Sequence, residues 1–533
     1  MPASATESTA TDSRLRTGGQ RFVRNVLWNW GHVLFSLLAA VLLSPYIIRK
    51  LGAEGYGVWS LVNSILGYYT LLDLGFRSAV VRFSAHYRAR GEYGRVNELM
   101  NTLVVSLAGP AVVAVLITVP LSRWSGQFFQ ISPAYRPTFS VLVLLVGLSV
   151  SLGIVFNLFS GLLEGFQRFD LDNQGRILCF VIRYVGAAAA LALGYGLVTM
   201  GILALAGSIA LFVWCVLAAR RMFPALRFSR AGVNLEMLKE TARFGASTLL
   251  AAIAIQVLDQ APAIVIGHYL PVAFVGYYAL PVRLLQSLTE FVGRVGIVAS
   301  PRAAELAAKG RMDEVARLSV CVNRYCLGIY AIPAIVLLVY GREILTLWVG
   351  AEFASHCAPI LPILLLGTAF AQAGQFASSA ILFGLARHHR YAQGLAVEAV
   401  IGFLGILAAV PRFGIAGAAA AIFGAMFVIR GLSTPWLFCR YLKLEYGKYM
   451  RSILWRPVLT GLPVLLLLYG LKTWVWAGGS WLQLLVVAAL TATTYLGLAY
   501  FSCLEPAHRV WLAEWVGRRW RRGEEAWQSR RRN

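Results

Sequence analysis

Long apolar runs dominate this sequence and decide what it can fold into. Residues 28–48 and 141–163 are two such runs, and each is long enough to cross a bilayer as a helix, which takes about 20 residues. Of the 533 residues, 58% are hydrophobic and 14% are charged, whereas soluble domains carry roughly a quarter of charged residues. Alternating strand patterns of the outer-membrane barrel type are absent. We therefore predict an all-α polytopic membrane protein.

The first third of the chain matches its middle at a constant offset of 219 residues, as between Gly57 and Gly276. At this offset Arg24 falls on Arg243, and the tripeptide at 89–91 falls on a similar one at 308–310. Hydrophobic spans and basic loops stay in phase through the overlap. Two copies of one helical unit in a membrane chain are a common plan for transporters.

The spans predict about fourteen transmembrane helices, arranged as two pseudo-symmetric six-helix lobes and two C-terminal helices. The expected helices are 22–48, 56–75, 97–121, 138–163, 175–196, 198–219, 243–268, 272–298, 319–340, 359–383, 391–411, 415–438, 454–475 and 480–503. The expected domains are a flexible cytoplasmic tail (1–21), an N-lobe (22–220), an inter-lobe linker (221–242), a C-lobe (243–440), the last helix pair (441–503) and a basic cytoplasmic tail (504–533).

The net charge of +24 is concentrated in alternate loops and in the C-terminal tail. This asymmetry predicts that the basic loops and both termini are cytoplasmic. Two polar connections, 86–100 and 303–318, have a helical pattern, and we expect each to lie along the membrane surface with its basic face toward anionic headgroups. No nucleic-acid-binding motif accompanies the charge, so no nucleic-acid partner is expected.

Motifs for catalysis and cofactor binding are missing from the sequence. The seven cysteines form no C-x-x-C pair, which argues against a zinc site or a disulfide framework. No Walker, G-x-S-x-G or H-E-x-x-H motif is present, so the chain has no visible means to hydrolyse ATP. The external loops are short, which disfavours a membrane glycan transferase or polymerase. We expect a transporter without a cofactor, not an enzyme.

Three segments resemble the start of a known transporter family. They are 24–28 (Arg-Asn-Val-Leu-Trp), 51–57 (Leu-Gly-Ala-Glu-Gly-Tyr-Gly) and 71–76 (Leu-Leu-Asp-Leu-Gly-Phe). They are similar to the polysaccharide transporters, the Wzx-type flippases of the multidrug/oligosaccharidyl-lipid/polysaccharide (MOP) exporter superfamily. The resemblance is strongest over 22–100.

The resemblance implies a fold, a substrate and a location. Members of this family carry a lipid (undecaprenyl) pyrophosphate-linked oligosaccharide across the bacterial inner membrane for exopolysaccharide, capsule or O-antigen assembly. It implies a MATE-like pair of lobes around a central cavity, lined by helices 1 and 7 and working by alternating access. Membrane lipids, glycosyltransferases and the glycan polymerase are the implied partners. In lipid II flippases of the superfamily, helices 13 and 14 form a lipid-facing groove.

Other functions stay open beside this one. A peptidoglycan lipid II flippase and an ion-coupled drug exporter are the alternatives within transport. Helix 1 lacks the carboxylate that cation-coupled drug exporters of the superfamily use, which weakens the second alternative. A membrane glycan transferase or polymerase is the alternative from a different class.

Charged side chains within membrane spans are costly unless they face water or a partner, so each is a candidate site residue. Arg24 and Arg243 open the first helix of each lobe, where two guanidiniums could grip a pyrophosphate; the alternative is snorkelling at the membrane edge. Arg283 and Arg294 lie on one face of a helix. Arg183 is a further candidate for a cationic cavity.

Carboxylates and aromatic side chains complete the predicted site. Asp259, Glu290 and Glu398 are candidates for ion coupling, with H+ or Na+ as the coupling ion. The alternatives are a salt bridge for Asp259 and an i,i+4 pair with Arg294 for Glu290. The candidates for sugar contact are Trp28, Tyr68 and Tyr277. Two further i,i+4 pairs are predicted to be structural, and they are Asp73 with Arg77 and Glu164 with Arg168.

Overall fold

The structure is a computed structural model that describes residues 43–73, 75–227, 233–297, 299–385, 388–476, 478–510 and 514. Every regular element in these residues is a helix, as predicted. The chain divides into two compact units, Met1–Val282 with Leu395–Ile422 (unit 1) and Arg283–Gly394 with Phe423–Asn533 (unit 2). The lobes predicted at 22–220 and 243–440 are defined by the sequence repeat and not by contacts, so their boundaries stay a prediction.

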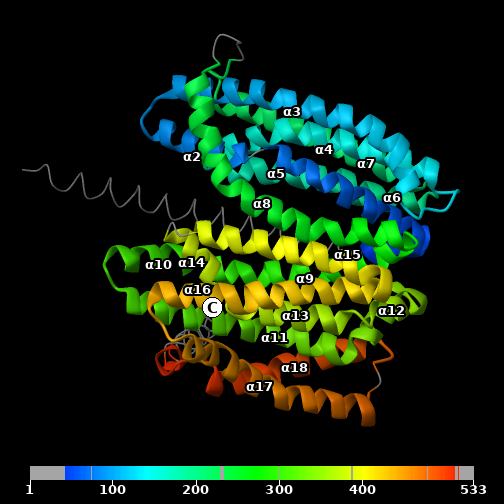
Figure 1. Cartoon of the computed structure of the whole chain (residues 1–533), viewed down its shortest axis with the longest axis vertical. Coiled ribbons are helices and arrows are strands. Elements are labelled where there is room, and N and C mark those ends of the chain that lie inside the picture. Colours follow the sequence, from blue (N-terminus) through cyan, green and yellow to red (C-terminus); the bar gives the residue numbers. More distant parts are fainter. Residues whose placement is uncertain are drawn as a thin grey trace, which may run out of the picture. The chain divides into compact units, whose positions relative to one another are not determined.

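Unit 1 is built around α4, which packs against α2, α3, α5 and α7 (Figure 1). Its elements are a helix at 43–67, the 3₁₀ helix η1 (Tyr68–Asp73), α2 (Phe76–Ala89), α3 (Tyr93–Phe128), α4 (Arg136–Gly165), α5 (Phe169–Phe180), the π-helix η2 (Val181–Val185), α6 (Gly186–Ala192), α7 (Leu197–Met222) and α8 (Leu235–Tyr269).

Unit 2 is built around α11, which packs against α13, α17 and α18 (Figure 1). Helix α9 (Ala273–Ile297) passes from unit 1 into unit 2. Helix α15 (His388–Met426) begins and ends in unit 2, but its residues Leu395–Ile422 belong to unit 1. The remaining elements of unit 2 are α10 (Ala299–Ala308), α11 (Met312–Val349), α12 (Ala351–Cys357), α13 (Leu361–Ala373), α14 (Ser378–Gly384), the π-helix η4 (Phe427–Ser433), α16 (Thr434–Leu442), α17 (Tyr446–Trp474) and α18 (Trp481–Ser502).

Ten helical stretches of the described residues are long and apolar enough to cross a membrane. One of them, His389–Leu442, covers two predicted helices, 391–411 and 415–438. The left-handed φ of 58° at Gly414 interrupts α15 between them, a conformation that glycine adopts without a Cβ penalty. The protein is therefore a multi-pass membrane protein. The number fourteen stays a prediction, because residues 22–42 of the first expected helix lie outside the described residues.

The repeat reappears in two turns with the same hydrogen bonds. At the end of α2, Gly91 donates to the Arg88 carbonyl and Glu92 to the Tyr87 carbonyl. At the end of α10, Gly310 and Arg311 make the equivalent bonds to the residues 219 positions after those acceptors, 307 and 306. Both glycines are left-handed, with φ of 72° and 73°. Each turn is a Schellman motif, which needs a left-handed residue after the helix.

These turns correct one prediction. The segments 86–100 and 303–318 do not form continuous surface helices. In each, a helix ends at Ala89 or Ala308 and a new one begins after three intervening residues, at Tyr93 or Met312. The left-handed glycine breaks the helical path that the polar pattern alone suggests.

A reciprocal contact joins the two repeats inside unit 1. A Cβ on Gly57 would lie 2.1 Å from the Val272 carbonyl oxygen, and a Cβ on Gly276 would lie 3.3 Å from the Ala53 carbonyl oxygen. Gly57 and Gly276 are equivalent in the repeat, and so are Ala53 and Val272. The helix at 43–67 therefore crosses the start of α9 on a pair of equivalent glycines, where the backbones approach closely.

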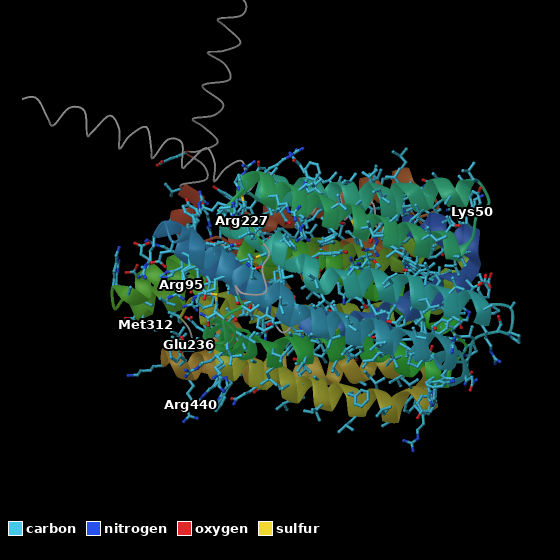
Figure 2. The ribbon with its side chains drawn as sticks, turned by 90° about the horizontal axis from the view of Figure 1, so that it is seen from above. Lys50, Arg95, Arg227, Glu236, Met312 and Arg440 are labelled. Carbon is cyan, nitrogen blue, oxygen red and sulfur yellow. The ribbon has the colours of Figure 1, made fainter. Side chains whose placement is uncertain are left out.

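Labelled basic side chains lie at both ends of unit 1. Arg95 and Arg227 lie at one end of its helices, and Lys50 lies at the other (Figure 2). The backbone N–H of Arg227 donates to the Asn97 side chain at 3.0 Å, which holds the linker against the start of α3. The prediction of a cytoplasmic end rests on the basic loops that contain Arg95 and Arg227.

Candidate functional site

Helix α8 places Arg243 differently from the prediction. The helix begins at Leu235, where the Asn234 side chain accepts hydrogen bonds from the N–H groups of Glu236 (2.8 Å) and Met237 (3.3 Å). Such a cap satisfies N–H groups that the first turn leaves open. Arg243 is therefore exposed about two turns inside the helix, and the predicted start at 243 is wrong. Its partner in the prediction, Arg24, lies outside the described residues, as does Trp28.

Further along α8, a polar face meets the end of the helix at 43–67. Gln256 donates to the Gly67 carbonyl and, at 3.1 Å, to the Thr70 hydroxyl. Both acceptors flank Tyr68, a predicted sugar contact that is half-buried in η1. Asp259 lies one turn after Gln256 and is exposed. Two predicted residues thus come from elements that the structure packs together.

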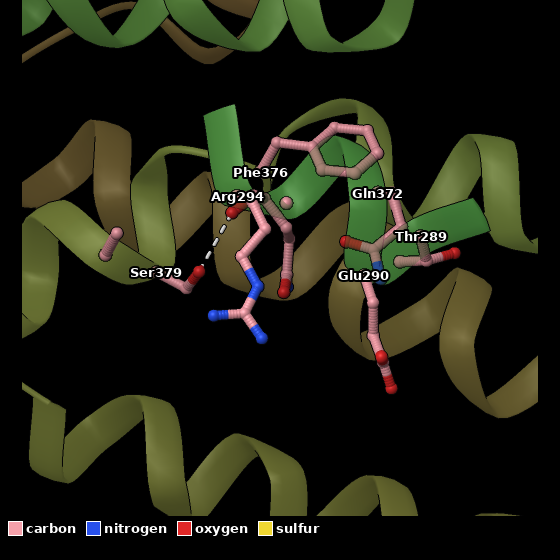
Figure 3. Close-up of a pocket in the computed structure, with 9 residues that line it drawn as sticks. Thr289, Glu290, Arg294, Gln372, Phe376 and Ser379 are labelled. Carbon is pink, nitrogen blue, oxygen red and sulfur yellow. Dashed lines mark hydrogen bonds between the residues drawn. The ribbon is translucent and has the colours of Figure 1, made fainter. Parts of the chain in front are cut away.

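The predicted polar stripe of α9 is present. Arg283, Glu290 and Arg294 are all exposed. The predicted pair of Glu290 with Arg294 is absent, because no ion pair within the described residues involves either side chain. The two charges instead extend side by side in the same direction (Figure 3).

Glu290 and Arg294 open into a pocket of unit 2 with a volume of about 470 Å³. The pocket lies between α9 and the junction of α13 with α14 (Figure 3). Its lining is Thr289, Glu290, Gly293, Arg294, Gln372, Gln375, Phe376, Ser379 and Ala380. Arg283 is not part of this lining. The volume is in the range of sites that hold small organic ligands.

A break in a membrane helix forms one wall of the pocket. The helix predicted at 359–383 is two helices, since α13 ends at Ala373 and α14 begins at Ser378. The turn between them presses against α9 at Gly296, where a Cβ would lie 2.0 Å from the Phe376 carbonyl oxygen. Irregular backbone at membrane depth is tolerated where it is buried in protein or lines a water-filled cavity. Sequence reasoning missed this break, because residues 374–377 contain no proline to mark it.

The other predicted site residues lie elsewhere in the fold. Arg183 belongs to the π-helix η2, and its side chain packs against Gly207 of α7. Such π-bulges occur frequently at functional sites. Glu398 of α15 is fully buried. Tyr277 is 6% exposed and packs edge-on against Phe274 at 5.5 Å between ring centroids, so its face is covered in this conformation. The roles of these three residues stay predictions.

Unit 1 contains a buried polar network that sequence reasoning missed. Asp172 is 3% exposed and accepts from Arg176 at 2.7 Å and from Ser160 at 2.5 Å. Its i,i+4 spacing to Arg176 was a usable signal, but the predicted helix began at 175 and left Asp172 outside. The network neutralises its own charge, so it is more suited to holding α4 and α5 together than to binding a ligand.

Two predicted i,i+4 ion pairs are absent from the described part of the chain, and their residues contact other partners. Arg77 pairs with Glu164 at 2.7 Å, across two helices. Arg168 pairs with Asp170 at 2.9 Å, and Asp73 accepts a hydrogen bond from the backbone of Gly75. The tertiary contact is available because α2 packs on α4.

One cluster of the described residues has donor atoms suited to a metal. The thiol of Cys321, a carboxylate oxygen of Glu505 and a ring nitrogen of His508 lie within 4.8 Å of one another. His508 is already hydrogen-bonded to Tyr325 at 2.7 Å, and Arg324 lies 4.0 Å from Glu505. These contacts satisfy the groups without an ion.

Comparison with known proteins fixes the family. The model of the polysaccharide biosynthesis protein family matches residues 22–307. The chain belongs to this family. As a polysaccharide biosynthesis protein, it is 24% identical over 349 residues to the uncharacterized membrane protein EpsK of Bacillus subtilis (strain 168), covering 64% of this chain and 68% of EpsK. It is 22% identical over 432 residues to a protein of Shigella flexneri named as an O-antigen transporter, covering 78% of this chain and 98% of the relative.

Solved structures show that this member of the family has the fold of MOP transporters. The lipid II flippase MurJ in an inward-closed conformation matches with a TM-score of 0.71 at 12% identity, over 90% of this chain and 98% of MurJ. An inward-facing multidrug resistance MATE transporter of the MOP superfamily matches with a TM-score of 0.62 at 13% identity, over 77% of this chain and 95% of that one. The predicted MATE-like fold is therefore confirmed.

Proposed function

We propose that the protein is a flippase for a lipid pyrophosphate-linked oligosaccharide and works by alternating access in the bacterial inner membrane. Family membership and the likeness to a named O-antigen transporter support the polysaccharide class. The undecaprenyl carrier, the inner membrane and the cytoplasmic termini belong to the proposal. So does the partnership with glycosyltransferases that supply the substrate and a polymerase that consumes it.

The observation that most supports this proposal concerns the Arg283 guanidinium. It is exposed on α9, in a helix that follows the membrane-spanning α8 after three residues. No hydrogen bond or ion pair within the described residues uses it. The sequence predicts that residues 272–298 span the membrane, where a cation is costly unless water or an anion meets it. A pyrophosphate supplies that anion, and a guanidinium can bind it through two parallel hydrogen bonds.

Ion coupling is a second part of the proposal. Asp259 is exposed on α8 within the candidate span Leu249–Tyr269, and a carboxylate in a span is costly unless it meets water or a partner. Glu398 is fully buried, and a buried carboxylate changes its charge only with a rearrangement around it. We propose Asp259 as the coupling group, with Glu290 and Glu398 as the other candidates.

Arg283 and Arg243 should be required for flipping. The assay measures movement of polyprenyl pyrophosphate oligosaccharide across vesicles that contain the purified protein. We expect Arg283→Ala and Arg243→Ala each to slow movement about tenfold or more, since a hydrogen bond to a charged group contributes roughly 1.5–3 kcal/mol. Lysine at either position should restore part of the rate, because the charge remains but the fork does not.

Arg227→Ala is the control, because Arg227 is exposed in the linker and its backbone makes the contact to Asn97. Movement at the wild-type rate in the Arg283→Ala, Arg243→Ala double variant would refute the cationic mechanism. The same vesicles tested with lipid II and with a cationic drug decide between the proposal and its two transport alternatives. Hydrolysis or extension of the glycan would instead show an enzyme.

A further inference from the structure

The break between α13 and α14 is held by buried hydrogen bonds. The side-chain oxygen of Asn323 accepts from the Ala377 N–H at 2.7 Å. Its amide nitrogen donates to Ser378 at 2.9 Å and to the Tyr449 hydroxyl at 3.0 Å. Asn323 and Ser378 are fully buried. Because these groups are satisfied, the break is a fixed part of the fold, and the residues on either side of it face the pocket in a set geometry.

Three side chains of the pocket keep their hydrogen-bonding capacity open. They are the Gln372 amide, the Glu290 carboxylate and the Arg294 guanidinium, and no partner within the described residues uses them. The other polar side chains of the lining form hydrogen bonds within the protein. Thr289 donates to the Leu285 carbonyl at 2.9 Å, and Ser379 donates to the Gln375 carbonyl at 3.0 Å.

The chemistry of these three side chains, one cation, one anion and one neutral amide, determines which ligands the pocket can bind. Arg294 attracts an anion, but Glu290 lies beside it and repels the same anion (Figure 3). A pyrophosphate therefore gains little in this pocket. A polyhydroxylated ligand satisfies all three groups, because its hydroxyls donate to Glu290, accept from Arg294 and do both with Gln372. When a bound ligand displaces water from the Glu290 carboxylate and the Arg294 guanidinium, these groups need hydrogen-bonding partners on the ligand.

We propose that this pocket is a sugar subsite, which binds uncharged hydroxyl-bearing residues of the transported glycan through Gln372, Glu290 and Arg294. The inference rests on the proposed function, and it assigns the two parts of the substrate to different residues. The pyrophosphate is bound by cations outside the pocket, and Arg283 is the one on the same helix. Eleven residues separate Arg283 from Arg294, which is about 16 Å along a helix. The charged and uncharged parts of one substrate thus meet different parts of α9.

The test compares two probes in the same vesicles, a polyprenyl pyrophosphate that carries an oligosaccharide and the same lipid without sugar. We expect the wild-type protein to move the glycosylated lipid in preference to the bare one. Gln372→Ala and Glu290→Gln should each lower that preference about tenfold, because each removes one good hydrogen bond to the glycan. Movement of the bare lipid by the Gln372→Ala variant should not change.

A second pair of variants tests the space itself. Gly293 lines the pocket, and a Cβ there would meet nothing within 4 Å. Gly293→Leu should fill the pocket and abolish the preference for the glycosylated lipid, whereas Gly293→Ala should keep most of it. The first added carbon of both side chains extends into open space, and equal thermal unfolding midpoints of the two variants would show that the fold is kept.

The outcomes separate the two proposals. If the wild-type protein moves neither lipid, the flippase function is wrong and the subsite falls with it. If it moves both and no variant changes the ratio, the flippase stands and the subsite is refuted. If Glu290→Gln speeds the bare lipid, the pocket binds phosphate and the sugar assignment is wrong.

Discussion

At the scale of single residues, Gly296 and Gly293 are three positions apart on α9 and meet opposite surroundings. A Cβ on Gly296 would lie 2.0 Å from the Phe376 carbonyl oxygen, which is backbone and cannot turn away. Gly296→Ala should therefore destabilise the protein by about 1–3 kcal/mol, the usual cost of overpacking. Gly293→Ala should leave the free energy of unfolding nearly unchanged. Thermal unfolding of both variants in detergent gives the comparison, and equal midpoints would show that the turn at 374–377 yields to the added methyl.

Residue-level prediction from the sequence worked where spacing carried the information. The spacing of Glu290 and Arg294 placed them on one face, and both do line one pocket. The spacing could not show that Glu290 and Arg294 form no ion pair, since pairing also depends on the other groups and the solvent around each side chain. Gln372 was missed because it lies in an apolar run, where an isolated amide gives no pattern. Its role depends on a break that only tertiary contacts create.

At the scale of helices, Arg324 fastens the last two to the rest of unit 2. It is 5% exposed in α11 and donates to the Ser452 carbonyl of α17 at 3.0 Å and to the Cys503 carbonyl at the end of α18 at 3.3 Å. A second fastening lies further along α11, where Lys472 of α17 pairs with Glu343 at 2.8 Å. The helix pair thus packs through polar contacts as well as through its apolar core.

Arg324→Ala should loosen α17 and α18, because it leaves the buried Cys503 carbonyl without its donor at a cost of about 1–3 kcal/mol and also removes the bond to the Ser452 carbonyl. Arg324→Lys should not restore stability, since one ammonium cannot reach both carbonyls as the guanidinium fork does. Limited proteolysis of the connection after α18 measures the loosening. Arg342→Ala serves as the control, because that residue lies on the same helix outside this contact. Equal cleavage of all three variants would show that the apolar core alone holds the pair.

Prediction of helices from the apolar pattern succeeded for long spans and failed at their interruptions. The spans 97–121 and 138–163 lie within α3 and α4, which extend further at both ends. The π-helices η2 and η4 left no signal, because an extra residue in a turn does not alter hydropathy. The start of α8 was placed eight residues late, because the polar first turns of a helix outside the bilayer carry no apolar pattern.

At the scale of the whole molecule, topology is the open prediction. Arg227 and the segment after α3 lie at opposite ends of that helix (Figure 2). In a variant without its native cysteines, a membrane-impermeant thiol reagent applied to intact cells should label Ala134→Cys and spare Arg227→Cys. The asymmetry of basic residues sets this orientation. Labelling of Arg227→Cys from outside would reverse the topology, and permeabilised cells, in which both sites should react, provide the control.

The contact between Gly57 and Gly276 has a consequence for the origin of the chain. In a symmetric dimer, position i of one subunit touches position j of the other, and j touches i in return. The pairs Gly57 with Val272 and Gly276 with Ala53 obey that rule at the offset of the repeat. An ancestral half-length protein that dimerised through this surface would already contain the crossing. Duplication and fusion of its gene would then preserve the helix crossing, and no new contact would be needed. Each of the two glycines could then be replaced only by a residue that still fits against the opposite helix.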